Sequence, residues 1–168
     1  WFIDNNYEAI PSHGPLPVSV PGTVDGWFML HERFGKMPMS DLLAPTIAYA
    51  EAGFPVSQLI SYYWQRAVPI LAKWPGFTDQ FTLEGRAPAH GEIWKNPNLA
   101  MTLRTLAKEG RDAFYKGDIA LVIANFMAEN GGFLSYQDLA THQGNWIEPV
   151  SANYRGYDVW ELPPNGQG

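Results

Sequence analysis

The sequence contains no cysteine, which excludes disulfides and thiolate metal sites and leaves the compartment open. It also lacks a basic character, because 17 acidic residues outnumber 11 lysines and arginines and give a net charge of −6. That balance argues against a nucleic-acid surface. No run of about 18 apolar residues is present, so no segment is expected to span a membrane. The Asn-x-Ser/Thr sequon of secreted glycoproteins is absent as well.

What is present is enough for one folded domain. The chain has 168 residues, of which 46% are apolar and 17% charged, so it can bury a core. Seven tryptophans and eight tyrosines are scattered over the expected helices, and we interpret them as core and interface side chains rather than a carbohydrate platform. Trp1 opens the chain without a start signal, and Pro163–Gly168 stops it within a turn. We therefore interpret residues 1–168 as an interior piece of a larger protein.

Local signals predict a helix-rich chain. Thr23, Ser40 and Asn96 are expected N-caps, the last with a proline at N1, and Ser135 with Asp138 resembles a capping box. The expected helices cover residues 24–34, 40–52, 57–73, 97–109, 118–130 and 135–140. Their expected buried faces include Ile60, Tyr63, Trp64, Ala67 and Leu71 in the third helix, Leu99, Leu103 and Leu106 in the fourth, and Ile119, Val122, Ile123, Phe126 and Met127 in the fifth.

The remaining segments are expected to be strands and loops. Residues 17–20 read as a short strand, and residues 74–92, rich in Gly and Pro, as an exposed and mobile loop. Residues 146–150 and 154–162 read as two strands joined by a turn around 153–156. The fold class is therefore α+β, a helix-rich segment with one C-terminal strand pair.

The residues offer little chemistry of their own. The four histidines, His13, His31, His90 and His142, lie far apart in sequence and form no His-x-x-x-His pair. Asp25 and Glu32 are seven apart on one helix, which is too common a spacing to indicate an acid–base pair. Asp112, Lys116 and Asp118 surround the Phe114–Gly117 turn and read as solvated charge around an aromatic anchor. We assign no catalytic, substrate-binding or metal-ligating residue to this chain.

Six local motifs, in order and in register, resemble the gamma-glutamyltranspeptidase family. They are Val20–Trp27 (the family's VPG-x-V-x-G), Leu43–Val56 (with its GFPV exit), Asn96–Leu103 (NPDLA-x-TL), Gly110–Ala120 (G-x-x-x-FYxGxIA), Gly131–Leu139 (GGxLxxxDL) and Pro149–Pro164 (the strand pair with its PP turn). The resemblance covers nearly the whole chain from Val20 onward.

This resemblance implies an N-terminal nucleophile hydrolase with the αββα fold. Such a protein is made as one chain that cuts itself into a large and a small subunit. The threonine freed at the start of the small subunit attacks a γ-glutamyl amide, and its own α-amine takes the proton. The acyl group then passes to water or to an amino acid. No metal or organic cofactor is implied. The implied partners are the remainder of the large subunit, the small subunit of the same precursor, and a small γ-glutamyl substrate.

Matched position by position, residues 1–168 fall in the middle of the large subunit. The family's nucleophile, oxyanion-hole glycines and paired serines would follow Gly168, and its carboxylate-binding arginine would precede Trp1. None of the arginines here matches that arginine's motif: Arg33, Arg66, Arg86, Arg104, Arg111 and Arg155. The 168 residues alone are therefore expected to be inactive.

The segment Pro163–Gly168 departs from the family's Pro-Pro-x-Ser-Ser-Gly and indicates a divergent branch. An amide acylase of the cephalosporin-acylase type therefore stays open as an alternative, and so does a helical binding module without catalysis. The resemblance favours a periplasmic or extracellular protein, and the divergent branch leaves the cytoplasm open. In the intact enzyme we expect residues 157–162 to enter the central sheet and residues 163–168 to pass near the substrate cleft or the helix beside it.

Overall fold

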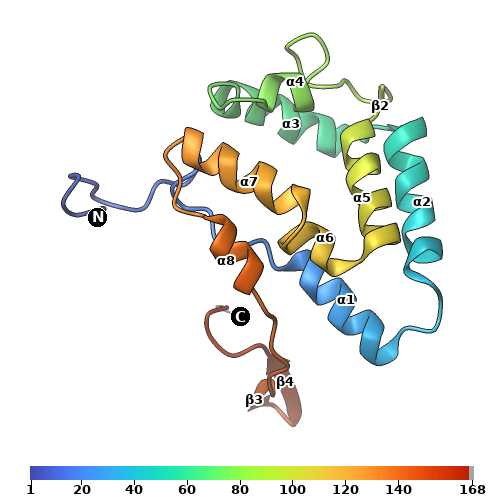
Figure 1. Ribbon diagram of the computed structural model, residues 1–168, viewed down its shortest axis with the longest axis vertical. Helices are drawn as coiled ribbons and strands as arrows, with labels where there is room; N and C mark the ends of the chain where they lie inside the picture. Colours follow the sequence, from blue (N-terminus) through green and yellow to red (C-terminus); the bar gives the residue numbers. More distant parts are fainter. Residues whose placement is uncertain (167–168) are drawn as a thin grey trace.

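The computed structural model describes residues 1–166, and helices form most of its body (Figure 1). The helices are α1 (Thr23–Phe34), α2 (Met39–Ala52), α3 (Gln58–Leu71), α4 (Phe77–Phe81), α5 (Pro97–Glu109), α6 (Arg111–Tyr115), α7 (Asp118–Glu129) and α8 (Tyr136–Thr141). Two antiparallel pairs accompany them: β1 (Phe54–Pro55) with β2 (Ile93–Trp94), and β3 (Val150–Tyr154) with β4 (Tyr157–Glu161). The helix-rich α+β class is confirmed.

One hydrophobic core lies where α1, α5, α6, α7 and α8 meet. Tyr115, Leu106 and Leu139 are its largest fully buried side chains. Its other members are Val24, Leu103, Ala120, Met127 and Leu134. Helix α2 lies beside α5 and adds the partly buried Leu43 and Ile47 (Figure 1). The core therefore joins Val24 of the first helix to Leu106, Tyr115 and Leu139, which lie more than 80 residues further along the chain.

Two of the predicted helix caps are confirmed. Asn96 Oδ1 accepts the Leu99 N–H at 2.9 Å, with a proline at the next position. Ser135 and Asp138 form a capping box, in which each side chain accepts the other residue's backbone N–H. These caps depend on residues three apart, and that is why the sequence predicts them well.

The caps predicted at Thr23 and Ser40 are wrong. Helix α1 has Gly22 as its N-cap and includes Thr23 as its first residue. Helix α2 begins at Met39 after Pro38, whose carbonyl accepts the Leu42 N–H at 3.2 Å. That bond closes the first turn two residues earlier than a cap at Ser40 would.

Several of the predicted buried faces are exposed in this chain. Ile60 and Tyr63 of α3 are 50% and 60% exposed, Leu99 of α5 is 44% exposed, and Val122 of α7 is 67% exposed. Phe126 of α7 is also exposed. The sequence period is correct, but the described part of the chain places nothing over these stripes, so periodicity alone predicts a burial that this chain does not supply.

Residues 74–92 are more ordered than a loop. They contain α4, a bridge between Leu83 and Arg86, and the buried residues Ala87 and Pro88. Arg86 donates two hydrogen bonds of 2.7 Å to Glu92, and Ser61 Oγ of α3 donates to the Pro88 carbonyl at 2.9 Å. The predicted loop therefore contains a short helix and a buried turn, which Ser61 holds from outside the segment, while most of its other residues are exposed; its mobility stays a prediction.

The strand predictions are corrected at three places. Residues 17–20 form no strand, and the pair β1–β2 was not predicted. The first hairpin strand begins at Val150 rather than Trp146. Arg155 and Gly156, at φ of 53° and 86°, form the two-residue turn, as a type I′ hairpin requires. All ten residues of β3 and β4 are exposed, and the hairpin lies at the lower edge of Figure 1, below α8.

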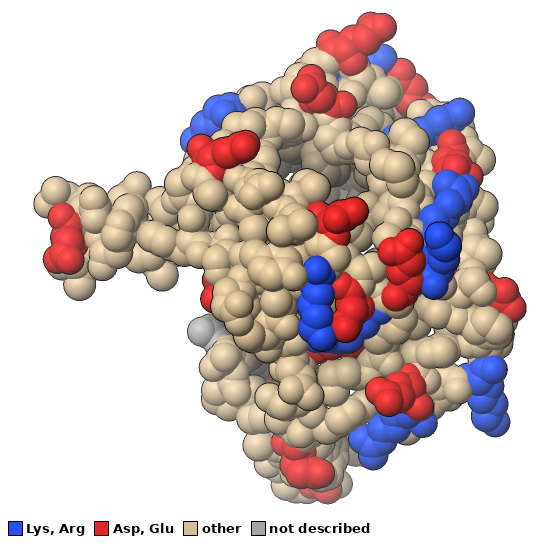
Figure 2. All heavy atoms as spheres, viewed as in Figure 1, with Lys and Arg blue, Asp and Glu red and all other residues tan. Residues whose placement is uncertain are grey.

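The surface carries charge of both signs. On the face shown in Figure 2, acidic and basic side chains interleave along the edge formed by α2 and α5, while much of the rest is uncharged. Arg104 and Glu51 form an exposed ion pair between those two helices. Within residues 1–166, no helix combines the length and the apolarity needed to cross a bilayer.

Candidate functional site: a buried ion pair between α1 and α6

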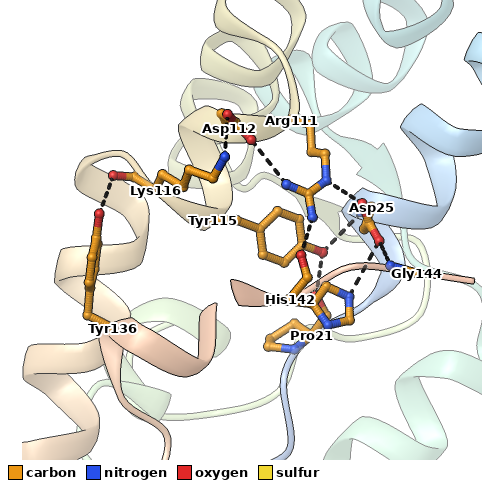
Figure 3. Close-up of polar contacts among 9 residues, drawn as sticks. All are labelled: Pro21, Asp25, Arg111, Asp112, Tyr115, Lys116, Tyr136, His142 and Gly144. Atoms are coloured by element: carbon orange, nitrogen blue, oxygen red, sulfur yellow. Dashed lines mark hydrogen bonds and ion pairs between the residues drawn. The ribbon is translucent and has the colours of Figure 1, made fainter. Parts of the chain in front are cut away.

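A buried carboxylate, Asp25, stands in the first turn of α1, and its side chain is only 3% exposed. Arg111 opens α6 directly after Gly110, whose φ of 79° lets the chain turn sharply out of α5. Arg111 Nε donates to Asp25 Oδ1, so α1 and α6 are joined by two residues that lie 86 positions apart in sequence (Figure 3).

The same two side chains bind the segment that leaves α8. The Gly144 N–H donates to Asp25 Oδ2 at 2.5 Å, and Arg111 Nη2 donates to the His142 carbonyl at 2.5 Å. His142 Nε2 lies 3.6 Å from Asp25 Oδ2. Both carboxylate oxygens of Asp25 are thus occupied, as a buried charge requires.

Tyr115 of α6 contacts the residues of this network through its hydroxyl and its ring. Its hydroxyl donates to the Pro21 carbonyl at 2.6 Å and accepts the Asp25 N–H at 3.0 Å (Figure 3). Its ring stacks on His142 at 5.2 Å between centroids and faces the Arg111 guanidinium at 4.5 Å. The fully buried Tyr115 therefore fixes both the start of α1 and the two groups that approach Asp25.

The electrostatics make Asp25 a fixed anion. Burial by itself would raise the pKa of Asp25, but hydrogen bonds from Arg111 and Gly144 and the nearby Arg111 and His142 side chains outweigh it, so the pKa is lowered. Burial raises the pKa of Tyr115, so its phenol stays protonated at neutral pH. A carboxylate with a lowered pKa and two occupied oxygens is unsuited to act as a general base.

A cavity of about 720 Å³ opens beside the pair. Asp25, Phe28, Met29, Glu32 and Arg33 of α1 line one side, and residues 140–144 with Trp146 line the other. Thr141 is a hydroxyl in this lining, but it donates to the Gln137 carbonyl at 2.7 Å within α8. Among residues 1–166, no group of three or more His, Cys, Asp or Glu side chains is placed to hold a metal ion. The network is built to hold elements together rather than to activate a nucleophile.

Some residues singled out in the sequence meet here, and others do not. Asp25 and Glu32 line one cavity, yet Glu32 takes no part in the hydrogen bonds around Asp25. Asp112 and Lys116 form an ion pair at 2.9 Å, and their side chains are 59% and 50% exposed. This agrees with the prediction that they are solvated charges beside an aromatic anchor. His31 lies elsewhere, with its ring 2.7 Å from the Met37 carbonyl.

Sequence reasoning missed the roles of Arg111 and His142. Neither stands at a diagnostic spacing from Asp25, because the contacts span 86 and 117 positions of the chain. Among the other arginines, Arg104 and Arg86 form exposed ion pairs with Glu51 and Glu92. No local signal marked the contacts of Arg111.

Comparison with known proteins gives these observations a family. The model of the Gamma-glutamyltranspeptidase family matches residues 2–168. The glutathione hydrolase-like YwrD proenzyme of Bacillus subtilis (strain 168) is 40% identical over 162 residues, which are 96% of this chain and 31% of that protein. Cephalosporin acylase from Bacillus halodurans superposes with a TM-score of 0.89 at 39% identity, covering 97% of this chain and 32% of the other. Helicobacter pylori gamma-glutamyltranspeptidase superposes with a TM-score of 0.87 at 30% identity, covering 92% and 45%.

The chain therefore belongs to the gamma-glutamyltranspeptidase family, whose fold it shares. It spans about a third of the length of the curated relatives that it matches. The predicted family and its fold are confirmed.

Proposed function

We propose that this chain is part of an enzyme that cleaves γ-glutamyl amides through an acyl-enzyme on a threonine outside residues 1–168. The observation that carries the proposal is the family match over residues 2–168, together with the close superposition on the Helicobacter pylori enzyme. In this proposal the chain is the middle of the large subunit, and its partners are the rest of that subunit and the small subunit of the same precursor. The curated relatives reported above include a proenzyme, which supports such processing.

The chemistry needs a nucleophile and a base that this segment does not have to supply. A threonine hydroxyl is a weak nucleophile, but a free α-amine with a pKa of about 8 can accept its proton. The hydroxyl oxygen attacks the γ-carbonyl carbon, the amide C–N bond breaks, and the leaving amine takes up the proton. Water or an amino acid then attacks the ester and regenerates the hydroxyl. Asp25 is the most buried carboxylate among the described residues, and both of its oxygens already accept hydrogen bonds, from Arg111 and Gly144. This supports a catalytic site formed by other parts of the protein.

A large uncovered surface supports the proposed partners. The chain exposes 12063 Å² of accessible surface, whereas a compact monomer of 18.8 kDa exposes roughly 8,300 Å². Apolar side chains such as Tyr63, Val122 and Trp160 are more than half exposed. The remainder of a precursor would cover such stripes.

An amide acylase on the same scaffold is the second candidate. The superposition on cephalosporin acylase supports it, and so does Gly166-Gln167 at the positions of the two serines in the Pro-Pro-x-Ser-Ser-Gly pattern. The two candidates share the nucleophile and differ in the acyl group that the pocket accepts. A binding module without catalysis is the third reading.

Substrate comparison with the full-length protein separates these readings. The purified protein is incubated with a γ-glutamyl anilide and with a glutaryl amide, and subunit formation is followed by electrophoresis. Release of aniline with self-cleavage supports the γ-glutamyl reaction, and selective turnover of the glutaryl amide supports the acylase. An uncleaved chain that turns over neither substrate indicates a binding module. Residues 1–168 purified alone serve as the control and should release no product, because nucleophile and oxyanion donors are expected outside them. Turnover by that piece, free of contaminating enzyme, contradicts the proposal.

A further inference from the structure

The segment between α8 and β3 lies along α1 and is held at both ends of that helix. Near the start of α1, Asp25 accepts the Gly144 N–H at 2.5 Å. Near its end, the Arg33 guanidinium lies 4.4 Å from the Trp146 ring centroid, and Phe34 packs edge-on against the same ring at 5.9 Å. We call residues 142–149 the linker. Its path follows α1, and the 720 Å³ cavity described above lies between the two.

The hairpin depends on this linker for its place. Every residue of β3 and β4 is exposed, so the hairpin is not packed into the helical core. Figure 1 shows it projecting below α8 at the end of the linker. A two-stranded hairpin alone is marginally stable in water, so its orientation is set by what it is attached to.

The side chains of Arg111 and Asp25 hold the start of the linker: each binds one backbone group of the linker, and the two side chains bind each other. Arg111 binds the His142 carbonyl through Nη2 and Asp25 through Nε, while Asp25 binds the Gly144 N–H. The planar guanidinium suits this, because it presents several donors in a fixed geometry. Asp25 and Arg111 stand at positions that the family motifs quoted above leave open, in VPG-x-V-x-G and in G-x-x-x-FY.

We propose that Asp25 and Arg111 are positioning residues, which fix the linker against α1 and thereby set where the β3–β4 hairpin and the turn after it enter the rest of the enzyme. The effect on activity rests on the proposed function, and the effect on the hairpin does not. Neither residue touches substrate in this account. Both act through the backbone of residues 142–144.

The test is hydrogen exchange on the full-length protein, read at the amides of β3 and β4, which do not bond to either residue. Arg111→Met removes all donors, and Asp25→Asn removes the charge while keeping an acceptor for Gly144. Amides of the hairpin should exchange about tenfold faster or more in each variant, while those of α5 stay near wild type. The double variant should exchange no faster than Arg111→Met alone, because both changes break one unit.

The matched control is Arg104→Met with Glu51→Gln, which breaks another arginine–carboxylate pair, between α5 and α2. Hairpin exchange in this control should equal wild type. Arg111→Lys keeps the charge but cannot bond to Asp25 and to the His142 carbonyl with the geometry of the guanidinium, so it should restore only part of the protection.

Activity provides a second readout. If the pair sets the fraction of correctly assembled sites, kcat for the γ-glutamyl anilide should fall severalfold in Asp25→Asn and Arg111→Met, with KM within twofold of wild type. Faster exchange throughout the molecule, or hairpin exchange unchanged in both variants, would overturn the proposal. A wild-type protein that turns over no substrate but shows the exchange pattern would instead reject the proposed function and leave the positioning role standing.

Discussion

At the scale of single residues, Tyr115 connects parts of the chain that lie 90 and 94 residues apart in sequence. Its hydroxyl is fully buried and bonds to the Pro21 carbonyl and the Asp25 N–H. Tyr115→Phe leaves both backbone groups without this partner and should lower the free energy of unfolding by about 1–3 kcal/mol, measured by denaturant titration of the full-length protein.

Tyr136→Phe is the control for that change. Its hydroxyl also donates to a backbone carbonyl, that of Lys116 at 2.9 Å, but Tyr136 is exposed. Water can replace this bond, so the loss should stay below about 0.5 kcal/mol. Equal losses in the two variants would contradict the structural weight given to Tyr115.

The lowered pKa of Asp25 predicts a pH dependence with a definite sign. Because its folded pKa lies below the ordinary value of 3.8, the ionised carboxylate stabilises the protein fully above that value. The stabilisation is lost as the pH falls through the folded pKa. The groups that face this carboxylate are Arg111 from α6 and His142 and the Gly144 N–H from the linker.

Comparison of wild type with Asp25→Asn isolates this effect. The difference between their free energies of unfolding should be largest and flat from about pH 5 to 7 and should narrow as the pH falls below about 4. A difference that widens on acidification would show that the folded pKa of Asp25 is raised.

At the scale of elements, local chemistry and long-range packing differ in how well the sequence predicts them. The caps at Asn96 and Ser135 depend on groups three residues away, and both are confirmed. The pair β1–β2 joins strands that are 38 or more residues apart, with two residues in each, too few for a periodic signal. The sequence predicts the family and the helix-rich class, because these depend on motif order and on period.

The candidate site itself was not predictable in the same way. Asp25, Arg111 and His142 each look like ordinary surface residues in their own segment, and only the packing of α1 on α6 brings them together. The exposed stripes on α3 and α7 have the opposite cause, since their period is clear but the described chain places no partner on them.

The turn after β4 remains a prediction about the intact protein. Gly166 has no positive φ here, and a Cβ at that position would meet open space. Gln167 and Gly168 lie outside the described residues. An approach of this turn to the substrate cleft therefore depends on parts of the protein beyond this segment.

Because Ser135 caps α8 and Ser40 caps no helix, the two serines should differ in their effect on stability. Ser135→Ala removes a side chain that caps α8 and should cost about 1 kcal/mol of unfolding free energy. Ser40→Ala, within α2, changes no cap and should stay within about 0.5 kcal/mol of wild type. Thermal or denaturant unfolding of both variants measures this. A cost at Ser40 as large as that at Ser135 would restore the cap that the sequence predicted.

At the scale of the whole molecule, residues 1–166 form one hydrophobic core and leave many large apolar side chains exposed. Its accessible area exceeds that of a compact protein of its mass by roughly 3,700 Å². That excess is more than a standard protein–protein interface buries in total. These areas agree with our proposal that this segment supports the site and that the reacting groups lie in another part of the precursor.

The most direct test of that assignment is to locate the acyl-enzyme. Full-length protein is incubated with a slowly hydrolysed γ-glutamyl ester, quenched in acid, digested and analysed by mass spectrometry. We predict a γ-glutamyl adduct on the threonine that begins the small subunit and on no peptide from residues 1–168. An adduct on any residue of this segment would contradict it.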